Sequence, residues 1–339
     1  MKTNELNVDI ISLQNIPEEV DLDFTPKTFD DYIGQTELKE KLALYTKAAK
    51  MRNEPLDHLL LFGPPGLGKT TLSTIMAHVM ETSIRICSGP MMERTGDLVA
   101  ILSSIEKKGI LFIDEIHRMP TNVEEVLYTA MEQFKVDMII GQGAGAKSIS
   151  LPINPFTLIG ATTKSGMISA PLRSRFGISE RLDFYTDIEL QDIVLQAARF
   201  LQCNIEQNGA LLIAKSARGT PRIAKKLVRR VRDFIQVHKK DPTKDSVSEA
   251  LSFLGIDQEG LSKVDLLILK TLTVQCNGGP IGLETLASLI GEDPETIEQV
   301  YEPFLMRKGF LEKTPRGRQI LPIKLPFLKA KFLGQQCIQ

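Results

Sequence analysis

The sequence predicts an α/β protein in which a parallel sheet is covered by helices on both faces, followed by a helical lid subdomain and a C-terminal winged helix. Three patterns predict this class. Short apolar runs alternate with amphipathic helical stretches from residue 30 to about 185, only helical patterns follow to residue 254, and three more helical patterns then precede a strand–turn–strand signal. Alternation of strands and helices is typical of a parallel sheet with crossover helices.

Four apolar runs in the first segment have the length of buried strands, and helical patterns separate them. The expected strands are His58–Phe62, Ser83–Cys87, Ile110–Ile113 and Thr157–Ala161, and the expected helices are Thr70–Met80, Asp97–Ile105 and Thr121–Phe134. Lys135–Leu151 interrupts this order with two β-like arms around a Gly-Ala-Gly turn. It predicts a protruding hairpin.

The rest of the chain divides near residue 256. Helical patterns run from Thr186 to Leu254 with a break at Ser216–Gly219. The later helices are expected at Lys263–Cys276, Leu283–Leu289 and Pro294–Lys308, before a hairpin at Phe310–Leu321. Three helices and a hairpin are the order of a winged helix, a relative of helix-turn-helix DNA readers. The predicted domains are therefore 1–185, 186–256 and 257–339.

Composition excludes several classes of protein. The 339 residues are 42% hydrophobic and 24% charged, which are ordinary globular values. No apolar run is long enough for a membrane span, the N-terminus has no signal-peptide order, and the four cysteines are scattered, so a reducing cytoplasm is expected. The net charge is −1, yet nine basic residues lie in Arg218–Lys240 and eight follow from Arg307 onward, which permits a DNA partner.

The strongest motif is the glycine-rich string that runs from Gly63 to Thr70. It reads GPPGLGKT and fits the phosphate-binding pattern G-x-x-x-x-G-K-[ST] between a strand and a helix. Glycines let backbone N–H groups curl around phosphate oxygens, and the helix N-terminus adds partial positive charge. Lys69 is expected to reach the β/γ-phosphates and Thr70 to ligate Mg²⁺.

A second motif, ILFIDEIH, begins at Ile110 and ends a buried strand with two carboxylates. Sites on open α/β sheets lie at such strand ends. Asp114 is expected to hold Mg²⁺ directly or through water, and Glu115 to act as the general base that aligns the attacking water. A solvated strand end is the alternative, which the upstream phosphate-binding loop disfavours.

Three further positions have the chemistry of a nucleotide hydrolase. Thr163 ends the apolar run TLIGATT, where it could orient water. Arg173 and Arg175 lie on one turn, and an arginine donated to a neighbouring subunit's γ-phosphate raises the rate by roughly 10³–10⁵. A surface salt bridge is the alternative for that pair. Arg222 begins a basic helix and could reach phosphate.

The histidines and the acidic segment are interpreted as structural. We expect His117 to cap the following helix, although nucleotide sensing is the alternative, and His58 to be structural. His78 and His238 lie in helical patterns without metal-ligand spacing, which makes a transition-metal site improbable. Glu292–Glu302 holds five acids and no base, and we expect a solvated helix surface there.

Taken together, these motifs resemble the AAA+ ATPases and, within them, the RuvB family, the motors of Holliday-junction branch migration. The strings that carry the resemblance are GPPGLGKTTL, LFIDEIHR, TLIGATT, PLRSRFG, ARGTPRIAKKLVRRVRDF and GFLEKTPRGR. They span essentially the whole chain. The last two, together with the predicted winged helix, separate the RuvB family from other AAA+ proteins.

The resemblance implies a set of site residues and partners. It implies that ATP is held by Gly63, Gly66, Gly68, Lys69, Thr70 and Thr71, with further contacts from Gln133, Phe134, Tyr185 and Arg222. Thr70 and Asp114 would bind Mg²⁺, Glu115 and Thr163 would act on water and γ-phosphate, and Arg175 would be the arginine finger. It also implies a homohexamer, junction DNA held by backbone contacts from Lys313, Arg316 and Arg318, the partner RuvA docked on the hairpin 135–151, and the resolvase RuvC in the wider complex.

Three positions depart from the family pattern, and two rival functions remain open. Thr25 stands where an arginine contact near adenine is common, Lys313 where the wing begins with arginine, and Pro294 where many relatives carry a DNA-facing arginine. A clamp-loader-like switch is one rival, although it usually has a helical collar in place of a wing. The other is a winged-helix regulator that uses ATP only as a ligand, which an intact Glu115 and Arg175 disfavour.

Overall fold

The computed structural model describes residues 26–140 and 147–333. Their contacts divide the chain into two compact units. The first runs to Tyr185 and also takes in Thr220–Arg222, and the second comprises Thr186–Gly219 and the chain from Ile223 onward. In the described ranges, no helix is long and apolar enough to cross a membrane. The segment before residue 24, Thr25, the hairpin tip and Cys337 lie outside the described residues.

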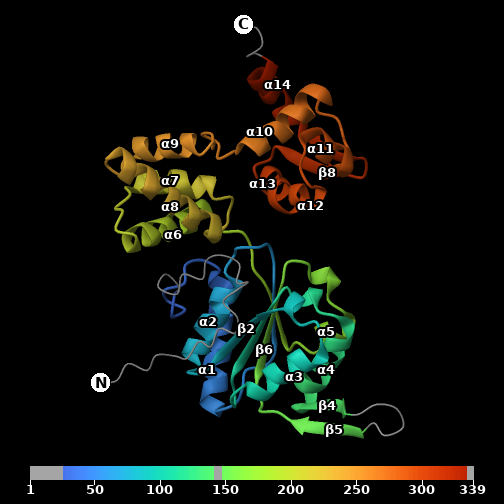
Figure 1. Cartoon of the computed structure of the whole chain (residues 1–339). Helices are drawn as coiled ribbons and strands as arrows, with labels where there is room; N and C mark the ends of the chain where they lie inside the picture. Colours follow the sequence, from blue (N-terminus) through green and yellow to red (C-terminus); the bar gives the residue numbers. More distant parts are fainter. Residues whose placement is uncertain (1–25, 141–146, 334–339) are drawn as a thin grey trace. The chain divides into compact units, whose positions relative to one another are not determined.

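A five-stranded parallel sheet forms the centre of the first unit, with the strand order β2-β3-β6-β1-β7 (Figure 1). The strands are β1 (Leu59–Phe62), β2 (Ile84–Ser88), β3 (Ile110–Asp114), β6 (Thr157–Thr162) and β7 (Ile178–Arg181). The four predicted strands are confirmed to within a residue or two. The three central strands, β3, β6 and β1, are almost wholly buried because helices cover both of their faces.

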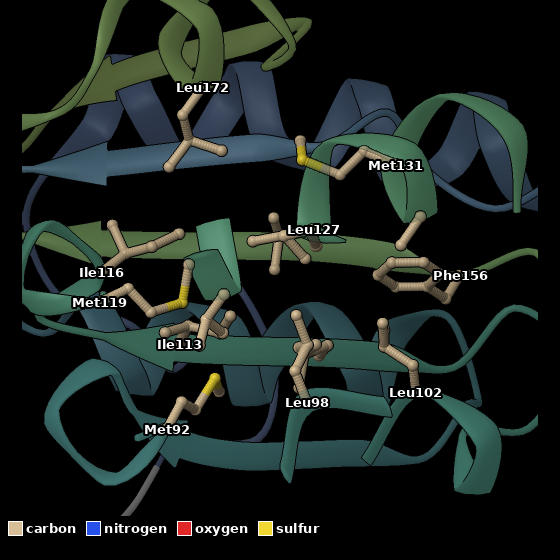
Figure 2. Packing of buried hydrophobic residues seen from close by; sticks show 14 of the residues in the cluster. Met92, Leu98, Leu102, Ile113, Ile116, Met119, Leu127, Met131, Phe156 and Leu172 are labelled. Atoms are coloured by element: carbon tan, nitrogen blue, oxygen red, sulfur yellow. The ribbon is translucent and has the colours of Figure 1, made fainter. Parts of the chain in front are cut away.

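The helices of this unit lie on the two faces of the sheet, as the sequence predicted (Figure 1). Helices α1 (Thr36–Arg52) and α2 (Lys69–Val79) cover one face, and α3 (Thr95–Ser104), α4 (Thr121–Gln133) and α5 (Ala170–Ser174) cover the other. Figure 2 shows part of the buried cluster between this second group and the sheet: Leu98, Leu127 and Leu172 belong to it, together with Ile113 of β3 and with Phe156. That cluster fixes the strand ends from which the functional side chains project.

Helix α1, the short helix α5 and strand β7 of the first unit were not predicted. Helix α1 carries Leu38, Leu42 and Ala49 on its buried face, a helical spacing that was available in the sequence. Strand β7 is an edge strand that reads ISER, and its side chains alternate between half-buried and exposed. Its polar composition hides it from a search for apolar runs, and only its pairing with β1 defines it.

The predicted hairpin is confirmed. Strands β4 (Lys135–Ile140) and β5 (Lys147–Pro152) pair antiparallel, with Val136 opposite Leu151. Val136 is buried in the core, whereas Ile149 and Leu151 are exposed. The hairpin therefore joins the core at its base and presents apolar side chains to solvent along β5.

The second unit begins with four helices and ends in the winged helix. The first part holds α6 (Asp187–Phe200), α7 (Gln207–Ser216), α8 (Pro221–His238) and α9 (Lys244–Phe253), and the predicted break falls between α7 and α8. The second part holds α10 (Lys263–Lys270), α11 (Leu283–Ile290), α12 (Pro294–Thr296), α13 (Glu302–Arg307), β8 (Leu311–Thr314) and β9 (Gly317–Ile320). Helix α14 (Leu325–Leu333) follows and was not predicted. The winged-helix order is confirmed.

A buried ion pair joins the connection between α7 and α8 to the winged helix. Arg218 donates to Asp265 on α10, and its guanidinium lies 5.0 Å from the ring centroid of Phe304 and 5.4 Å from that of Tyr301. Asp265 is fully buried, and its carboxylate also accepts hydrogen bonds from Ser262. Arg218 therefore has a structural role, although it belongs to the basic run that suggested a DNA partner.

Gly89 provides a test of how the sheet edge is packed. A Cβ at this position would lie 2.5 Å from the carbonyl oxygen of Glu115, which follows β3. Gly89→Ala is expected to cost about 1–3 kcal/mol of stability, because backbone atoms must move to admit the methyl group. Urea unfolding followed by circular dichroism measures this change.

Gly96→Ala is the matched control, since a Cβ there meets nothing within 4 Å. Alanine in α3 should leave stability unchanged or raise it by about 0.5–1 kcal/mol. Equal stability of the two variants would contradict the packing described for Gly89.

Candidate nucleotide site and nucleic-acid surface

The glycine-rich loop connects β1 to α2 and is held by its surroundings. Gly68 has φ 101°, a left-handed conformation, and a Cβ there would lie 2.6 Å from the hydroxyl of Tyr32. Glycine is therefore required both for the turn and for the close approach. The loop delivers Lys69 and Thr70 to the first turn of α2, where free backbone N–H groups favour anions.

Lys69 is turned back over the loop that precedes it. Its Nζ donates to the carbonyl oxygens of Gly63, at 2.8 Å, and Pro64, at 3.0 Å. The residue is only 7% exposed, and burial lowers its pKa, while the charges of Asp114 and Glu115 act in the opposite direction. These two bonds use two of the three N–H donors of the ammonium group, so Lys69 can still donate to an anionic phosphate oxygen.

The carboxylates predicted at the end of β3 lie beside this loop because of the strand register. Strand β6 pairs with β3 on one side and with β1 on the other, so their carboxyl ends meet at one edge of the sheet. Gly63 opens the loop, and its N–H donates to the carbonyl of Thr162 at 3.2 Å. Burial and the charge of Glu115 raise the pKa of Asp114, and the N–H of Glu115 donates to Asp114 Oδ1.

Glu115 is held on both sides by side chains that were considered separately in the sequence. Thr163 Oγ1 donates to its carboxylate at 3.2 Å, and His117 Nδ1 lies 3.1 Å from Glu115 Oε2. His117 Nδ1 also lies 2.8 Å from Thr162 Oγ1. The expectation that His117 caps the following helix is therefore wrong, since its ring faces the carboxylate.

His58 is structural, as expected: its Nδ1 accepts from the N–H of Leu158, and its Nε2 lies 3.1 Å from the carbonyl oxygen of Met131.

The Tyr185 hydroxyl lies 3.2 Å from the loop carbonyl of Leu67, next to a second tyrosine that the sequence did not indicate. The Tyr185 hydroxyl donates to the Tyr32 hydroxyl at 2.7 Å, and Tyr32 donates to the carbonyl of Leu67 at 3.2 Å. Both rings are buried. Thr220–Arg222 belong to the same compact unit, and the N–H of Arg222 donates to Gly66 O at 3.3 Å. Tyr32 had no local signal, because only the fold brings it to residue 67.

The two candidate finger arginines differ in their surroundings. Arg175 lies 4.6 Å from the ring centroid of Tyr128, forms an ion pair with Glu132 at 3.1 Å, and donates to Pro171 O. Arg173 is exposed and donates to Ser165 O. The partners of Arg175 belong to α4 and α5, and among the described contacts none is a residue of the glycine-rich loop. Its side chain is 23% exposed and is held by residues of α4 and α5.

Gln133 is the last residue of α4, and Phe134 follows it. Both come directly after Glu132, the residue that pairs with Arg175. Gln133 is exposed, whereas Phe134 has φ 49° and packs edge-on against Phe156, with ring centroids 6.1 Å apart. The carbonyl of Phe134 also accepts the N–H of Ile153. Phe134 is therefore fixed by the core, and Gln133 is the more accessible of the two predicted nucleotide contacts.

The three basic residues predicted to contact DNA are not equivalent. Arg318 Nε donates to Glu302 Oε1 at 2.6 Å, and Lys313 Nζ lies 2.9 Å from Glu302 Oε2 and 3.0 Å from Glu298 Oε1. Glu302 is 0% exposed, so the interpretation of Glu292–Glu302 as a solvated surface is wrong at this position. Arg316 lies exposed at the turn of the wing. Pro294 starts α12 behind Asp293, whose side chain accepts the N–H of Thr296.

The residues that could hold a divalent cation are Thr70 and Asp114, which have a hydroxyl and a carboxylate. No cluster of three or more His, Cys, Asp or Glu side chains suited to a metal occurs among the described residues. A hydroxyl and one carboxylate fit Mg²⁺, which keeps several waters and takes its other ligands from substrate phosphates. They do not fit a transition metal held by protein alone.

A strand, a glycine-rich loop and a helix in this order, with carboxylates at the end of another strand at the same edge of the sheet, define a P-loop ATPase domain. Three family models match consecutive parts of the chain: the Holliday junction DNA helicase RuvB P-loop domain at residues 24–182, the RuvB AAA lid domain at 185–257, and the RuvB C-terminal winged helix domain at 258–329. The chain belongs to the RuvB family.

Relatives and solved structures agree with this membership. The Holliday junction branch migration complex subunit RuvB of Fusobacterium nucleatum is 50% identical over 315 residues, which cover 92% of this chain and 95% of the relative. The protein of the same name from Staphylococcus aureus is 50% identical over 321 residues, 94% of this chain and 96% of the relative. The structure of the Thermotoga maritima RuvB Holliday junction branch migration motor matches with a TM-score of 0.80 and 49% identity, over 90% of this chain and 98% of that one.

Proposed function

We propose that this chain hydrolyses ATP at the P-loop site and uses the energy to drive branch migration of Holliday junctions in recombination and DNA repair. One observation carries the proposal: the glycine-rich loop and the Asp114–Glu115 carboxylates meet at one edge of the sheet in a chain of the RuvB family. The unit that follows ends in a winged helix with an exposed basic wing. Phosphate chemistry and a DNA-binding element thus occur in one chain.

Each residue of the site has a proposed task in hydrolysis. Glu115 accepts a proton as the water oxygen bonds to the γ-phosphorus; the bond from that phosphorus to the β–γ bridging oxygen breaks, and ADP leaves with the electron pair. Lys69, the loop glycines and the N–H groups of Thr70 and Thr71 bind the phosphates. Thr70 and Asp114 would hold Mg²⁺, which neutralises charge on the phosphates when bound. Thr163 orients the water, and Tyr185, Arg222 and Gln133 are further nucleotide contacts.

Arg175 is proposed to act on the nucleotide of a neighbouring subunit. Its described partners lie on α4 and α5 of its own chain, so an arginine on this surface is available to a second copy. A finger supplied in this way accelerates phosphoryl transfer by roughly 10³–10⁵. We therefore propose a closed homohexameric ring whose activity depends on assembly.

Binding of DNA is assigned to the wing, and partner binding to the hairpin. A ring that moves along duplex DNA must hold phosphates and ignore base identity, which suits lysine and arginine side chains. The exposed Ile149 and Leu151 on β5 give RuvA an apolar docking surface, and RuvC joins the wider complex. The proposed location is the cytoplasm, together with the DNA.

A mixture of two inactive variants tests the shared site. Lys69→Ala removes the phosphate-binding lysine, and Arg175→Ala removes the finger, so each variant alone should lack ATPase activity. In randomly mixed rings about one quarter of the wild-type rate should return, because half of the sites keep Lys69 and half of their neighbours keep Arg175.

Steady-state phosphate release measures this recovery. Arg181→Ala serves as the control, since Arg181 is an exposed arginine on β7 that pairs with Asp183. It should behave as wild type. Mixtures that are no more active than either variant alone would contradict a site completed by the neighbouring subunit.

We expect different results when each of two arginines in the wing, which lie two residues apart, is replaced by alanine. Arg316→Ala should weaken duplex binding and lower the slope of log affinity against log salt by about 0.9, because one phosphate contact is lost. Arg318→Ala should instead destabilise the protein by about 1–3 kcal/mol, because the buried Glu302 loses one of its two cationic partners and keeps only Lys313. Fluorescence anisotropy from about 50 to 300 mM salt and urea unfolding separate the two effects. Affinity that does not change with salt would contradict the DNA assignment.

A further inference from the structure

We propose that His117 is a positioning residue for hydrolysis, which holds the carboxylate of Glu115 in the orientation from which it accepts the proton of the attacking water. The inference rests on the proposed role of Glu115 as the general base. It is carried by the contacts of the His117 ring, by its burial and by the backbone of Glu115.

The backbone of Glu115 is fixed before its side chain is considered. Glu115 has φ 48° and ψ 44°, a left-handed conformation that costs a non-glycine residue about 1–3 kcal/mol and persists only where the surroundings enforce it. Its N–H donates to Asp114 Oδ1, its carbonyl accepts the N–H of Arg118, and Gly89 packs against that carbonyl. Only the side-chain torsions of Glu115 remain to be set.

Two side chains set these torsions, and they differ in exposure to solvent. Thr163 is half-buried, and its hydroxyl lies 3.2 and 3.4 Å from the two carboxylate oxygens of Glu115, so its single proton serves one oxygen at a time. His117 is 4% exposed and faces Glu115 Oε2 at 3.1 Å. The side chain of Glu115 is 29% exposed, which leaves room for a water molecule beside it.

The His117 ring is itself anchored. Its Nδ1 lies 2.8 Å from Thr162 Oγ1, and that hydroxyl accepts the N–H of Lys164 at 3.0 Å. Thr162 is fully buried at the end of β6. A carboxylate offers only acceptors, so the contact with Glu115 is attractive when the proton is on Nδ1. Burial lowers the pKa of His117, and the neutral ring shares its one Nδ1 proton between Glu115 Oε2 and Thr162 Oγ1.

Thr163 and His117 are both hydrogen-bond donors to Glu115, and we assign them different roles. The Thr163 hydroxyl is accessible enough to turn toward a phosphate oxygen or water. The His117 ring is enclosed and tied to β6, so it keeps Glu115 oriented when Thr163 turns away. An orienting group behind a catalytic base is a common requirement, because a misplacement of about 1 Å can cost roughly 100-fold in rate.

The test measures ATPase kinetics of the full chain with duplex DNA present. His117→Ala should lower kcat about 10- to 100-fold, while KM for ATP and the affinity for a fluorescent ADP analogue change less than about threefold. His117→Asn should stay within about fivefold of the wild-type kcat, since its amide N–H can replace Nδ1–H toward the carboxylate. His78→Ala, at a partly exposed histidine on α2, should match wild type.

The variant Glu115→Gln distinguishes a failure of the proposed role of His117 from a failure of the proposed role of Glu115 as the general base. If His117 acts through Glu115, the double variant Glu115→Gln/His117→Ala should have the kcat of Glu115→Gln alone. A wild-type kcat for His117→Ala would overturn the role of His117 while leaving Glu115 as the base. Equal losses in His117→Ala and His117→Asn, with lowered melting temperatures in both, would show a structural role only. A wild-type kcat for Glu115→Gln would overturn the proposed base itself.

Discussion

The parallel register of β3, β6 and β1 is the constraint on which the site depends. Phe62 pairs with Thr162, and Ile113 with Gly160, so three strands end at one edge of the sheet. Parallel strands present their carboxyl ends together, and ligand sites on open α/β sheets lie there. The glycine-rich loop, the Asp114–Glu115 pair and Thr163 are separated along the chain but follow three adjacent strand ends. A change of register in any one strand would move its polar residues away from the others.

Burial at this edge makes the charges of the site interact strongly. Desolvation lowers the pKa of Lys69 and raises that of Asp114, and each charge partly offsets the penalty of the other. Interactions among partly buried charges are stronger than in water because the local dielectric constant is low. Phosphate groups bring further negative charge beside Lys69, which favours its charged form.

How far the sequence predicts the structure depends on whether a feature is local. The glycine-rich loop, the strand that ends in Asp114 and Glu115, and the wing around Arg316 are each set by a few consecutive residues, and the structure has them where the patterns indicated. Helix α1 was overlooked although its periodicity was present in the sequence. Edge strand β7 was missed because its residues are polar, and pairing alone defines it.

Features that depend on distant contacts were the ones mispredicted. His117 and Thr162 are 45 residues apart, so no local pattern could show that the ring faces β6 and Glu115 instead of capping a helix. Glu302 belongs to an acidic run that looks solvated, yet Arg318 and Lys313 reach it across the wing. In both cases a charged or polar side chain found its partner only through the tertiary fold.

The most direct test of the central claim is ATP-dependent dissociation of a synthetic four-way DNA junction by the full chain, with RuvA present or absent. The account predicts dissociation that RuvA stimulates and that disappears when Lys69 is replaced by alanine. Junctions that stay intact while DNA stimulates ATP hydrolysis would contradict branch migration and favour a clamp-loader-like switch. Tight ATP binding without any hydrolysis would contradict the motor altogether and favour a DNA-binding regulator.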